Sequence, residues 1–380
     1  MLCPFCNAPH IYLYLNNGKI KSQLKCKVCN STFRIDGKYR ESKSNYFCPY
    51  CDHALFVWKK HSKVTIHKCP NDNCPHRIKA INNLNPAEKL LAKLKSSQFK
   101  LSYQYREFHF TITDLEHSMP ESPKISLNRI YNSQNILGLI LTFYVSFAMS
   151  ARKTALLLRW VFQINISYQT VLNYAEASAF YCHRFNLANK GQSDPVQAGD
   201  ETYIKINGKH NYTFFFIGSK KRAITSYHVA DNRDTLPATA AMLEAKRSVP
   251  PDKNTTFITD GNPSYPSGIH FLNLSSDPTT RIQHHKVIGL QNLDSESEEF
   301  RPYKQLIERL NRTYKFHIKP AYGFNTFNGA MSLTTLFVTF YNFLRPHMAL
   351  NYKVPIPIEE ISGLPTIQAK WIKILSMASG

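Results

Sequence analysis

The sequence predicts a multidomain protein with two small cysteine-rich modules, a helical region and a larger α/β domain in its C-terminal half. Three observations support this prediction. Eight of the nine cysteines fall in pairs before residue 75. Residues 133–185 carry helical patterns joined by a short turn. From residue 195 to residue 350, alternating β-type runs are followed by helical patterns. Residues 83–132 and 351–380 are predicted as a linker and a C-terminal tail.

The cysteine pairs have the spacing of structural metal sites. One set is Cys3, Cys6, Cys26 and Cys29, and the other is Cys48, Cys51, Cys69 and Cys74. Each pair forms a tight knuckle that offers two thiolates, and two knuckles complete a tetrahedral zinc site. A redox pair is the alternative for a single CxxC, but four pairs in series favour metal. We therefore predict tandem zinc ribbons over residues 1–40 and 41–82, with one structural Zn²⁺ in each.

The charge of the chain predicts a polyanionic partner. Lys and Arg number 47 against 26 Asp and Glu, which gives a net charge of +21 spread along the sequence. Such a balance is typical of proteins that bind DNA, and a membrane surface is the weaker alternative. The longest apolar run, residues 136–149, is shorter than the roughly 20 residues that span a bilayer. We expect a soluble, cytoplasmic protein that works at the nucleoid and does not bind membranes.

The helical region has the plan of a helix-turn-helix. One helix is predicted over residues 150–160 and a second from Tyr168 to Tyr181, with Ser167 as its N-cap. In this plan the start of the second helix reads base edges in double-stranded DNA. Three polar residues lie at that exposed start: Gln169, Thr170 and Asn173. On the sequence alone, an ordinary helical hairpin within a core is an equal alternative.

The α/β region opens with an acid at the head of an alternating strand. Asp200, Thr202 and Ile204 would face one side of this strand, and Glu201 would face the other. Two more strands and a helix follow, and a fourth strand ends at Asp260. Three hairpin-linked strands, a helix and a strand that can pair parallel with the first form the opening of an RNase H-like fold. We predict this fold for residues 195–350.

A third acid lies on a predicted helix from about Pro302 to Phe316. Glu308, Arg312 and Lys315 recur on one face of this helix. A solvated salt-bridge face is the alternative for these three residues. Residues 294–299 are acidic and are predicted as a loop. Acids on two strand ends and one helix can converge on a pair of Mg²⁺ ions, which prefer oxygen ligands.

Four segments together resemble the DDE transposases of prokaryotic insertion sequences, in the branch with an integrase-type catalytic core. They are Asp200–Ile204, Thr259–Gly261, Ile307–Asn311 with Lys315, and Tyr341–His347. The interval between Asp260 and Glu308 is longer than is usual in this branch. Three other acids therefore compete for the third position: Glu296, Glu298 and Glu299. Glu308 is preferred because it shares a helical frame with Lys315.

The resemblance implies a DNA transposase with two catalytic Mg²⁺ or Mn²⁺ ions held by Asp200, Asp260 and Glu308. Such an enzyme binds transposon ends, frees a 3′-hydroxyl at each end and joins it to target DNA. Arg312 and Lys315 would contact DNA phosphate. Because two ends are brought together, a homodimer or a higher oligomer is expected. The alternatives are a non-catalytic DNA-binding regulator derived from a transposase and an RNase H-type nuclease.

Overall fold

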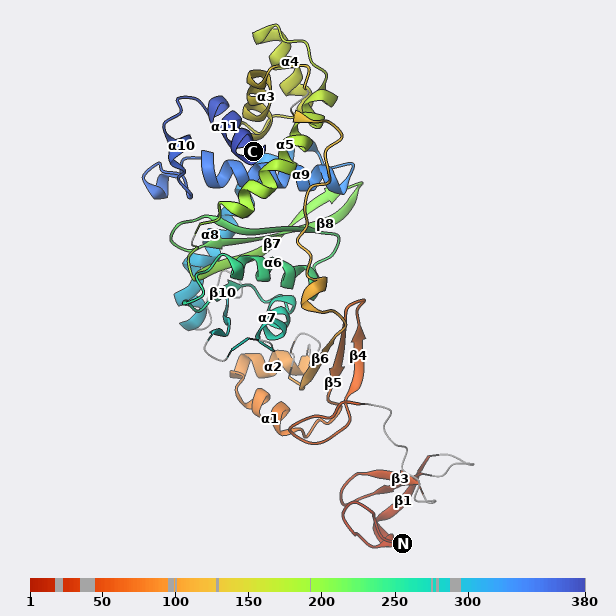
Figure 1. The fold of residues 1–380 in the computed structure, drawn as a ribbon. Coiled ribbons are helices and arrows are strands. Elements are labelled where there is room, and N and C mark those ends of the chain that lie inside the picture. Colours follow the sequence, from red (N-terminus) through yellow and green to blue (C-terminus); the bar gives the residue numbers. More distant parts are fainter. Residues whose placement is uncertain are drawn as a thin grey trace. The chain divides into compact units, whose positions relative to one another are not determined.

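The computed structural model describes residues 1–17, 23–34, 45–94, 99, 101–127, 130–191, 193–274, 276–277, 280–287 and 295–379. The chain divides into two compact units, Met1–Glu107 and Phe108–Gly380 (Figure 1). In the described ranges, no helix has the length and apolar character needed to cross a membrane.

The Met1–Glu107 unit contains two small three-stranded sheets, and each accompanies one set of cysteines. The first sheet follows a 3-10 turn, η1 (His10–Tyr12), and has the order β1 (Leu13–Asn17), β2 (Gln23–Cys26), β3 (Thr32–Arg34). The second has the order β4 (Phe56–Lys60), β5 (Val64–Lys68), β6 (Gln104–Phe108). Strand β6 comes from the interval predicted as a linker. Between β5 and β6 the chain forms two helices, α1 (Pro75–Asn82) and α2 (Pro86–Leu94).

The Phe108–Gly380 unit is built on one five-stranded sheet with the order β11-β10-β7-β8-β9. Its strands are β7 (Val196–Ile206), β8 (Lys209–Gly218), β9 (Ile224–Ala230), β10 (Thr256–Thr259) and β11 (Gln283–Lys286). The first three pair antiparallel, whereas β10 pairs parallel with β7 and β11 pairs parallel with β10. Helix α6 (Thr235–Arg247) lies between β9 and β10 in the chain. This order confirms the predicted RNase H-like core.

Helices cover both faces of this sheet (Figure 1). On one face, Phe215 of β8 packs edge-on against Tyr314 of α8 (Ser295–Ile318), and α9 (Phe327–Thr339) completes the layer. On the other face, Phe214 and Phe216 of the same strand pack against Tyr265 of α7 (Ser264–Leu274). The strict alternation of the strand therefore divides its aromatic residues between two separate cores.

Helix α8 is longer than predicted. It begins at Ser295 rather than near Pro302, and Pro302 lies inside it. The acidic stretch predicted as a loop is therefore helical where it is described. Carboxylates are favoured in the first turns of a helix because its N-terminus carries partial positive charge. Downstream, Ile307, Leu310 and Tyr314 form the predicted apolar stripe and are almost fully buried.

The predicted helix-turn-helix segment is helical apart from the connecting residues 147–150 and 163–167, and its last helix packs against α9. Helix α3 (Gln134–Leu141) continues into a π-turn, η5 (Thr142–Ser146), and is followed by α4 (Ala151–Phe162) and α5 (Tyr168–Ala188). The Oγ atom of Ser167 accepts a hydrogen bond from the backbone N–H of Thr170 at 3.0 Å, as expected for an N-cap.

The C-terminal segment completes the helical core. After α9, the chain forms a π-turn, η8 (Phe340–Leu344), a 3-10 turn, η9 (Met348–Leu350), and helices α10 (Glu359–Ser362) and α11 (Ile367–Ser379). Trp371 of α11 is fully buried, and its Nε1–H donates to the Oγ atom of Ser146 at 3.0 Å. Residues beyond 351 therefore pack with α3 and α5.

Candidate active site

Asp200 is held in the middle of β7 by contacts from the sheet and from α8. A Cβ atom at Gly199 would lie 2.2 Å from the ring of Phe216, so the position before the acid requires glycine. The Oδ1 atom of Asp200 lies 3.1 Å from Nζ of Lys304. Its Oδ2 atom accepts a hydrogen bond from Nδ2 of Asn311 at 3.1 Å. Two residues of α8 thus fix the direction of this carboxylate.

Asp260 lies at the end of the neighbouring strand. Strand β10 runs parallel to β7, with Ile258 opposite Ala198. Continuing both strands by two residues brings Asp260 beside Asp200. The backbone N–H of Asn262 donates to Oδ1 of Asp260 at 2.9 Å, which forms a local turn and sets the carboxylate's position.

Glu201 is a third acid at this edge of the sheet, although the strand alternation places it on the face opposite Asp200. Its side chain is only 7% exposed. Tyr265 Oη donates to Oε2 at 2.7 Å, and Asn262 Nδ2 donates to Oε1 at 3.0 Å. The guanidinium of Arg233 lies 3.8 Å from Oε1. Glu201 therefore connects β7 to the turn after Asp260 and to the start of α7.

Carboxylate oxygens of Asp200, Glu201 and Asp260 lie within 4.8 Å of one another. A hard divalent cation such as Mg²⁺ takes oxygen ligands at about 2.1 Å in an octahedral shell, so oxygens this close can share one ion. The donor set and its spacing therefore fit a divalent metal. Asp200 and Asp260 are the two members of this group that the sequence predicted as ligands.

The electrostatics of the group favour a bound cation. Burial raises the pKa of Asp200 to about 6, and the negative charges of Asp260 and Glu201 act in the same direction. The nearby Lys304 ammonium opposes the rise without cancelling it. Tyr265 is buried beside the same acids, and its pKa is raised well above its ordinary value. Negative charge at this edge is thus only partly compensated by the protein.

Glu308 lies on the face of α8 that contacts Asp200. It follows Lys304 by four residues and precedes Asn311 by three, and both of those side chains contact Asp200. Residues at these helical spacings point in the same direction. Among the described residues, however, Glu308 is not in the group whose oxygens lie within 4.8 Å of one another.

Two of the acids that compete with Glu308 for the third position, Glu298 and Glu299, are exposed, whereas Glu308 is half-buried. The third competitor, Glu296, has its side chain outside the described part of the structure.

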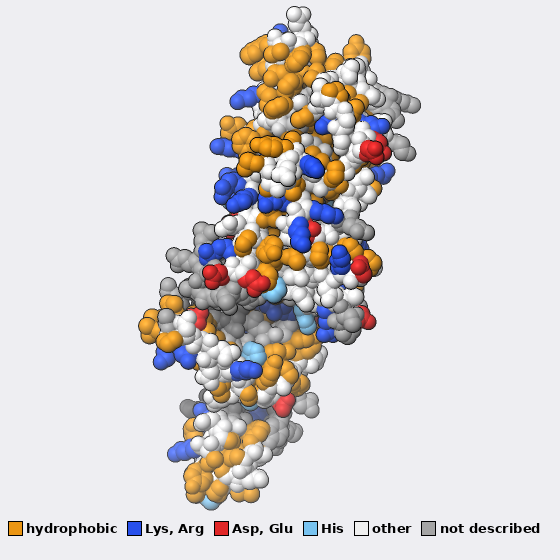
Figure 2. Space-filling model, turned by 90° about the vertical axis from the view of Figure 1, so that its left-hand side faces the viewer, with side chains coloured by type: hydrophobic (Ala, Val, Ile, Leu, Met, Phe, Trp, Pro, Cys, Tyr) orange, Lys and Arg blue, Asp and Glu red, His pale blue; other side chains and the backbone are white. Residues whose placement is uncertain are grey.

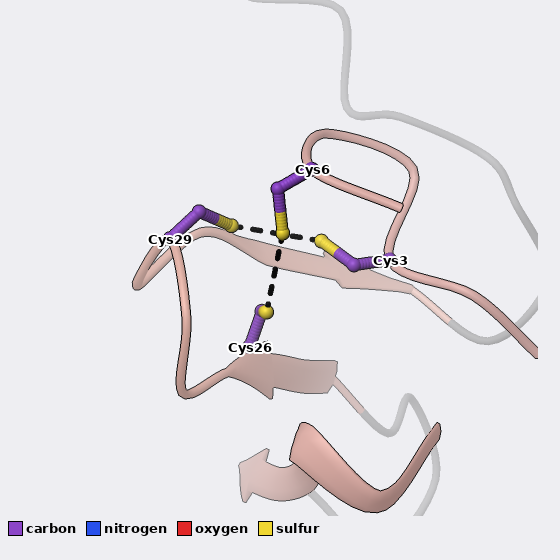
Figure 3. Close-up of side chains that lie close together, drawn as sticks. All are labelled: Cys3, Cys6, Cys26 and Cys29. Carbon is purple, nitrogen blue, oxygen red and sulfur yellow. Dashed lines mark hydrogen bonds between the residues drawn. The ribbon is translucent and has the colours of Figure 1, made fainter. Parts of the chain in front are cut away.

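Both cysteine sets close into compact clusters. In the first, the four sulfurs of Cys3, Cys6, Cys26 and Cys29 point toward one another (Figure 3). The Sγ atoms of Cys3 and Cys29 are 3.6 Å apart, and those of Cys6 and Cys26 are also 3.6 Å apart. Tetrahedral zinc with Zn–S bonds of about 2.3 Å separates its sulfurs by roughly 3.8 Å. The spacing therefore fits Zn²⁺.

The second cluster has the same form. The Sγ distances are 3.7 Å for Cys48 to Cys74 and 3.5 Å for Cys51 to Cys69. The cysteines of the described residues are free rather than disulfide-bonded. In the first cluster, hydrogen bonds from Ser31 lower the pKa of Cys29 to about 6, which favours the thiolate form that binds metal.

The comparison with protein families decides what kind of domain surrounds the acids. Residues 196–328, which contain Asp200, Asp260 and Glu308, match the family model of the DDE domain of IS240-type transposases. The chain carries a DDE transposase domain. This confirms the resemblance to insertion-sequence transposases over these residues, and it supports a function in DNA transposition by polynucleotidyl transfer.

Solved structures of integrases and a transposase resemble the chain at low identity. The HTLV-2 integrase catalytic core domain in complex with magnesium is 15% identical, covers 43% of this chain and 94% of its own, and has a TM-score of 0.28. The simian T-cell lymphotropic virus intasome in complex with PP2A regulatory subunit B56 gamma is 17% identical, covers 60% of this chain and 80% of its own, and has a TM-score of 0.32. The Mos1 strand transfer complex is 10% identical, covers 77% of this chain and 86% of its own, and has a TM-score of 0.26. The TM-scores are low, so these structures add no argument about the site. The search of curated proteins gave no match.

The residues predicted to contact DNA lie on exposed surfaces of the same unit. Arg312 and Lys315 are exposed on α8 within the DDE domain. Before that domain, at the start of α5, the Nε2 atom of Gln169 donates to Oδ1 of Asn173 at 2.9 Å. Gln169 is exposed, and Thr170 and Asn173 are half-exposed. On the face drawn in Figure 2, Lys and Arg side chains are more frequent than Asp and Glu and are scattered among apolar ones.

Several residues of this acidic group and its contacts were not predicted from the sequence. Lys304 had a readable signal, because it precedes Glu308 by one helical turn and carries the charge that an acid site requires. Glu201 was assigned to the opposite face by its alternation. Tyr265 carried no signal at all, because its contact with Glu201 exists only after α7 packs on the sheet.

Proposed function

We propose that this chain binds the terminal repeats of an insertion sequence as a homodimer or higher oligomer, frees a 3′-hydroxyl at each end and joins it to target DNA. The observation that carries the proposal is the convergence of Asp200, Asp260 and Glu201 within the matched DDE domain, next to the helix face that bears Glu308. The work would take place on chromosomal DNA, in the cytoplasm at the nucleoid.

In this proposal Asp200 and Asp260 hold two Mg²⁺ or Mn²⁺ ions, and Glu308 completes the ligand set. When bound, such a pair supplies activation of the attacking oxygen and stabilisation of the leaving oxygen during in-line phosphoryl transfer. Lys304 and Asn311 keep the Asp200 carboxylate oriented through contacts of 3.1 Å each. A rigid carboxylate holds its ligand without rearrangement, which favours catalysis.

The two reactions need only one site. Water attacks the phosphorus in cleavage, and the freed 3′-hydroxyl attacks a target phosphorus in joining. In each reaction one P–O bond forms to the attacking oxygen and one P–O bond to a DNA 3′-oxygen breaks. No covalent protein–DNA link is therefore needed. The exposed cations Arg312 and Lys315 hold DNA phosphates near the acids by charge.

The remaining predicted sites have supporting roles in the proposal. Base edges of the terminal repeat are read at the start of α5 by Gln169, Thr170 and Asn173. The two cysteine clusters each hold one structural Zn²⁺, whose binding stabilises the two small sheets of the first unit.

The test is a cleavage and joining assay with Mg²⁺ or Mn²⁺ on labelled DNA that carries the ends flanking this gene. We expect nicked and joined products from the wild type. Asp200→Asn and Asp260→Asn should abolish both while leaving affinity for the ends nearly unchanged. Binding without any cleavage by the wild type would instead favour a regulator. Cleavage without joined products would favour a nuclease.

The third acid is tested separately on α8. Glu308→Gln should reduce cleavage by at least about 100-fold, since it removes a charged ligand from the proposed metal site. Glu299→Gln is the matched control, because Glu299 lies on the same helix and is exposed. Equal activity of the two variants would remove Glu308 from the catalytic set.

A further inference from the structure

A groove runs between the helix-turn-helix and the loop that follows α8. Its volume is about 610 Å³. One wall is formed by the start of α4 and the start of α5, including Arg152, Tyr168 and Asn173. The opposite wall is formed by residues 320–326 and the start of α9.

The wall after α8 is fixed to the catalytic sheet. Helix α8 passes directly into the 3-10 turn η7 (Lys319–Ala321). Beyond it, Phe324 forms a parallel bridge with Ile206 at the end of β7. The backbone N–H of Asn207 donates to the carbonyl of Phe324 at 2.7 Å, and the N–H of Phe324 donates to the carbonyl of Lys205 at 2.8 Å. The same strand that carries Asp200 thus holds this wall in place.

Tyr322 stands at the rim of the groove in an unusual conformation. Its side chain is 94% exposed, and its backbone has φ 54°, in the left-handed region that large side chains rarely occupy. A bulky aromatic residue held at such a position costs backbone strain, and strain of this kind gathers at ligand-binding sites. Gly323, with φ 105°, completes the turn.

The groove chemistry suits a DNA strand. The guanidinium of Arg152 lies 5.1 Å from the ring centroid of Tyr168, which is itself 45% exposed. Lys124 adds a second positive charge to the lining. The single acid in the lining, Glu176, is half-buried, and burial raises its pKa. Exposed aromatic rings beside cations are the surfaces on which single-stranded bases stack and phosphates bind.

We propose that this groove guides one strand of the transposon end from the helix-turn-helix to the catalytic acids, with a base stacked on Tyr322 and a phosphate on Arg152. The proposal rests on the transposase function proposed above. Helix rise places the end of α8 roughly 15 Å from Glu308. At about 3.4 Å per nucleotide, the base on Tyr322 is about four to six nucleotides from the cleaved phosphate.

The test uses photo-crosslinking and binding with the full-length protein. End DNA carrying 5-iododeoxyuridine at one of the first ten positions is irradiated with the protein. We expect a crosslink to Tyr322 from about positions four to six only. Tyr322→Gly removes the ring where glycine fits the backbone without strain, and it should lose the crosslink and weaken end binding by about 5- to 100-fold. Tyr322→Phe should keep the affinity.

The matched control is Tyr352→Gly. Tyr352 is also exposed, at 72%, with φ 60°, but it lies outside the groove lining. Its substitution should leave end binding unchanged. Arg152→Gln should reduce the dependence of log affinity on log salt by about one, whereas Tyr322→Gly should leave that slope unchanged.

The outcomes separate this inference from the function on which it rests. If the wild type binds and cleaves the ends and Tyr322→Gly is equally active, the proposed role of the groove is wrong while the transposase function stands. Crosslinks only to other residues would have the same meaning. Failure of the wild type to bind or cleave the ends would overturn both.

Discussion

The Asp200 carboxylate lies in an environment that disfavours its charged form. Burial and two neighbouring carboxylates raise the pKa of Asp200 to about 6, although Lys304 lies 3.1 Å away. Without a cation, the charged form of Asp200 is therefore less stable in the folded protein than in the unfolded chain. This is the pattern of a site whose stability is sacrificed for ligand binding.

Asp200→Asn should consequently stabilise the metal-free protein. Because the folded pKa of about 6 exceeds the ordinary value of 3.8, the penalty is present above pH 6 and is relieved as pH falls toward 4. In EDTA at pH 8, we expect the variant to gain about 1–3 kcal/mol in free energy of unfolding. The gain should shrink through pH 6 and vanish near pH 4, as measured by denaturant unfolding.

Asp252→Asn provides the control, since Asp252 is exposed on a turn and should show no such gain. A loss of stability in Asp200→Asn at pH 8 would mean that the contact with Lys304 outweighs the burial of the charge.

Two of the three clustered acids could be predicted from the sequence, and the third could not. Asp200 and Asp260 could be paired from sequence, because each lies in or just after a β-type run and parallel strands bring their ends together. Glu201 could not, because alternation assigns it to the other face. Only the packing of α7 brings the Tyr265 hydroxyl to its carboxylate.

At the scale of elements, helix α8 links the acids to the rest of the catalytic unit. Its apolar stripe packs on the sheet, and Lys304 and Asn311 contact Asp200 from the helix face that also bears Glu308. Its length was underestimated because Pro302 is a common signal for a helix start. The preceding acidic residues form the first turns instead, where the helix dipole favours them.

The proposed zinc sites give a prediction for the two small sheets. Cys48→Ser removes a buried cysteine of the second cluster, so a protein with one Zn²⁺ in each cluster should lose one of its two zinc ions. The β4-β5-β6 sheet should then become sensitive to protease, while the Phe108–Gly380 unit, which has its own core, should remain resistant. Zinc content by a colorimetric indicator and limited proteolysis with mass spectrometry measure the two effects.

Cys182→Ala is the matched control for zinc content. Cys182 is fully buried within the helical core and belongs to neither cluster. It should retain both zinc ions. Two zinc ions in Cys48→Ser would contradict the assignment of that cluster.

In the whole molecule, the order of the domains along the chain could be predicted from local sequence patterns. The distant segments that complete the second sheet and the helical core could not. Cysteine spacing, helical periodicity and strand alternation each act over short distances and predicted the ribbons, the helices and the RNase H-like core. Two features depend on contacts between distant segments. They are the pairing of β6 as the third strand of the second sheet and the hydrogen bond from Trp371 to Ser146. No local pattern encodes such contacts, so these segments were predicted as linker and tail.

In the proposed function, Asp200, Asp260 and Glu308 direct a DNA 3′-hydroxyl onto target DNA. Joining assays with pre-cleaved ends that carry either a 3′-hydroxyl or a 3′-deoxy terminus measure this step alone. We expect the wild type to join only the 3′-hydroxyl ends to target DNA in Mg²⁺ or Mn²⁺, and Asp260→Asn to join neither. Joining of 3′-deoxy ends, or undiminished joining by Asp260→Asn, would contradict the proposed function.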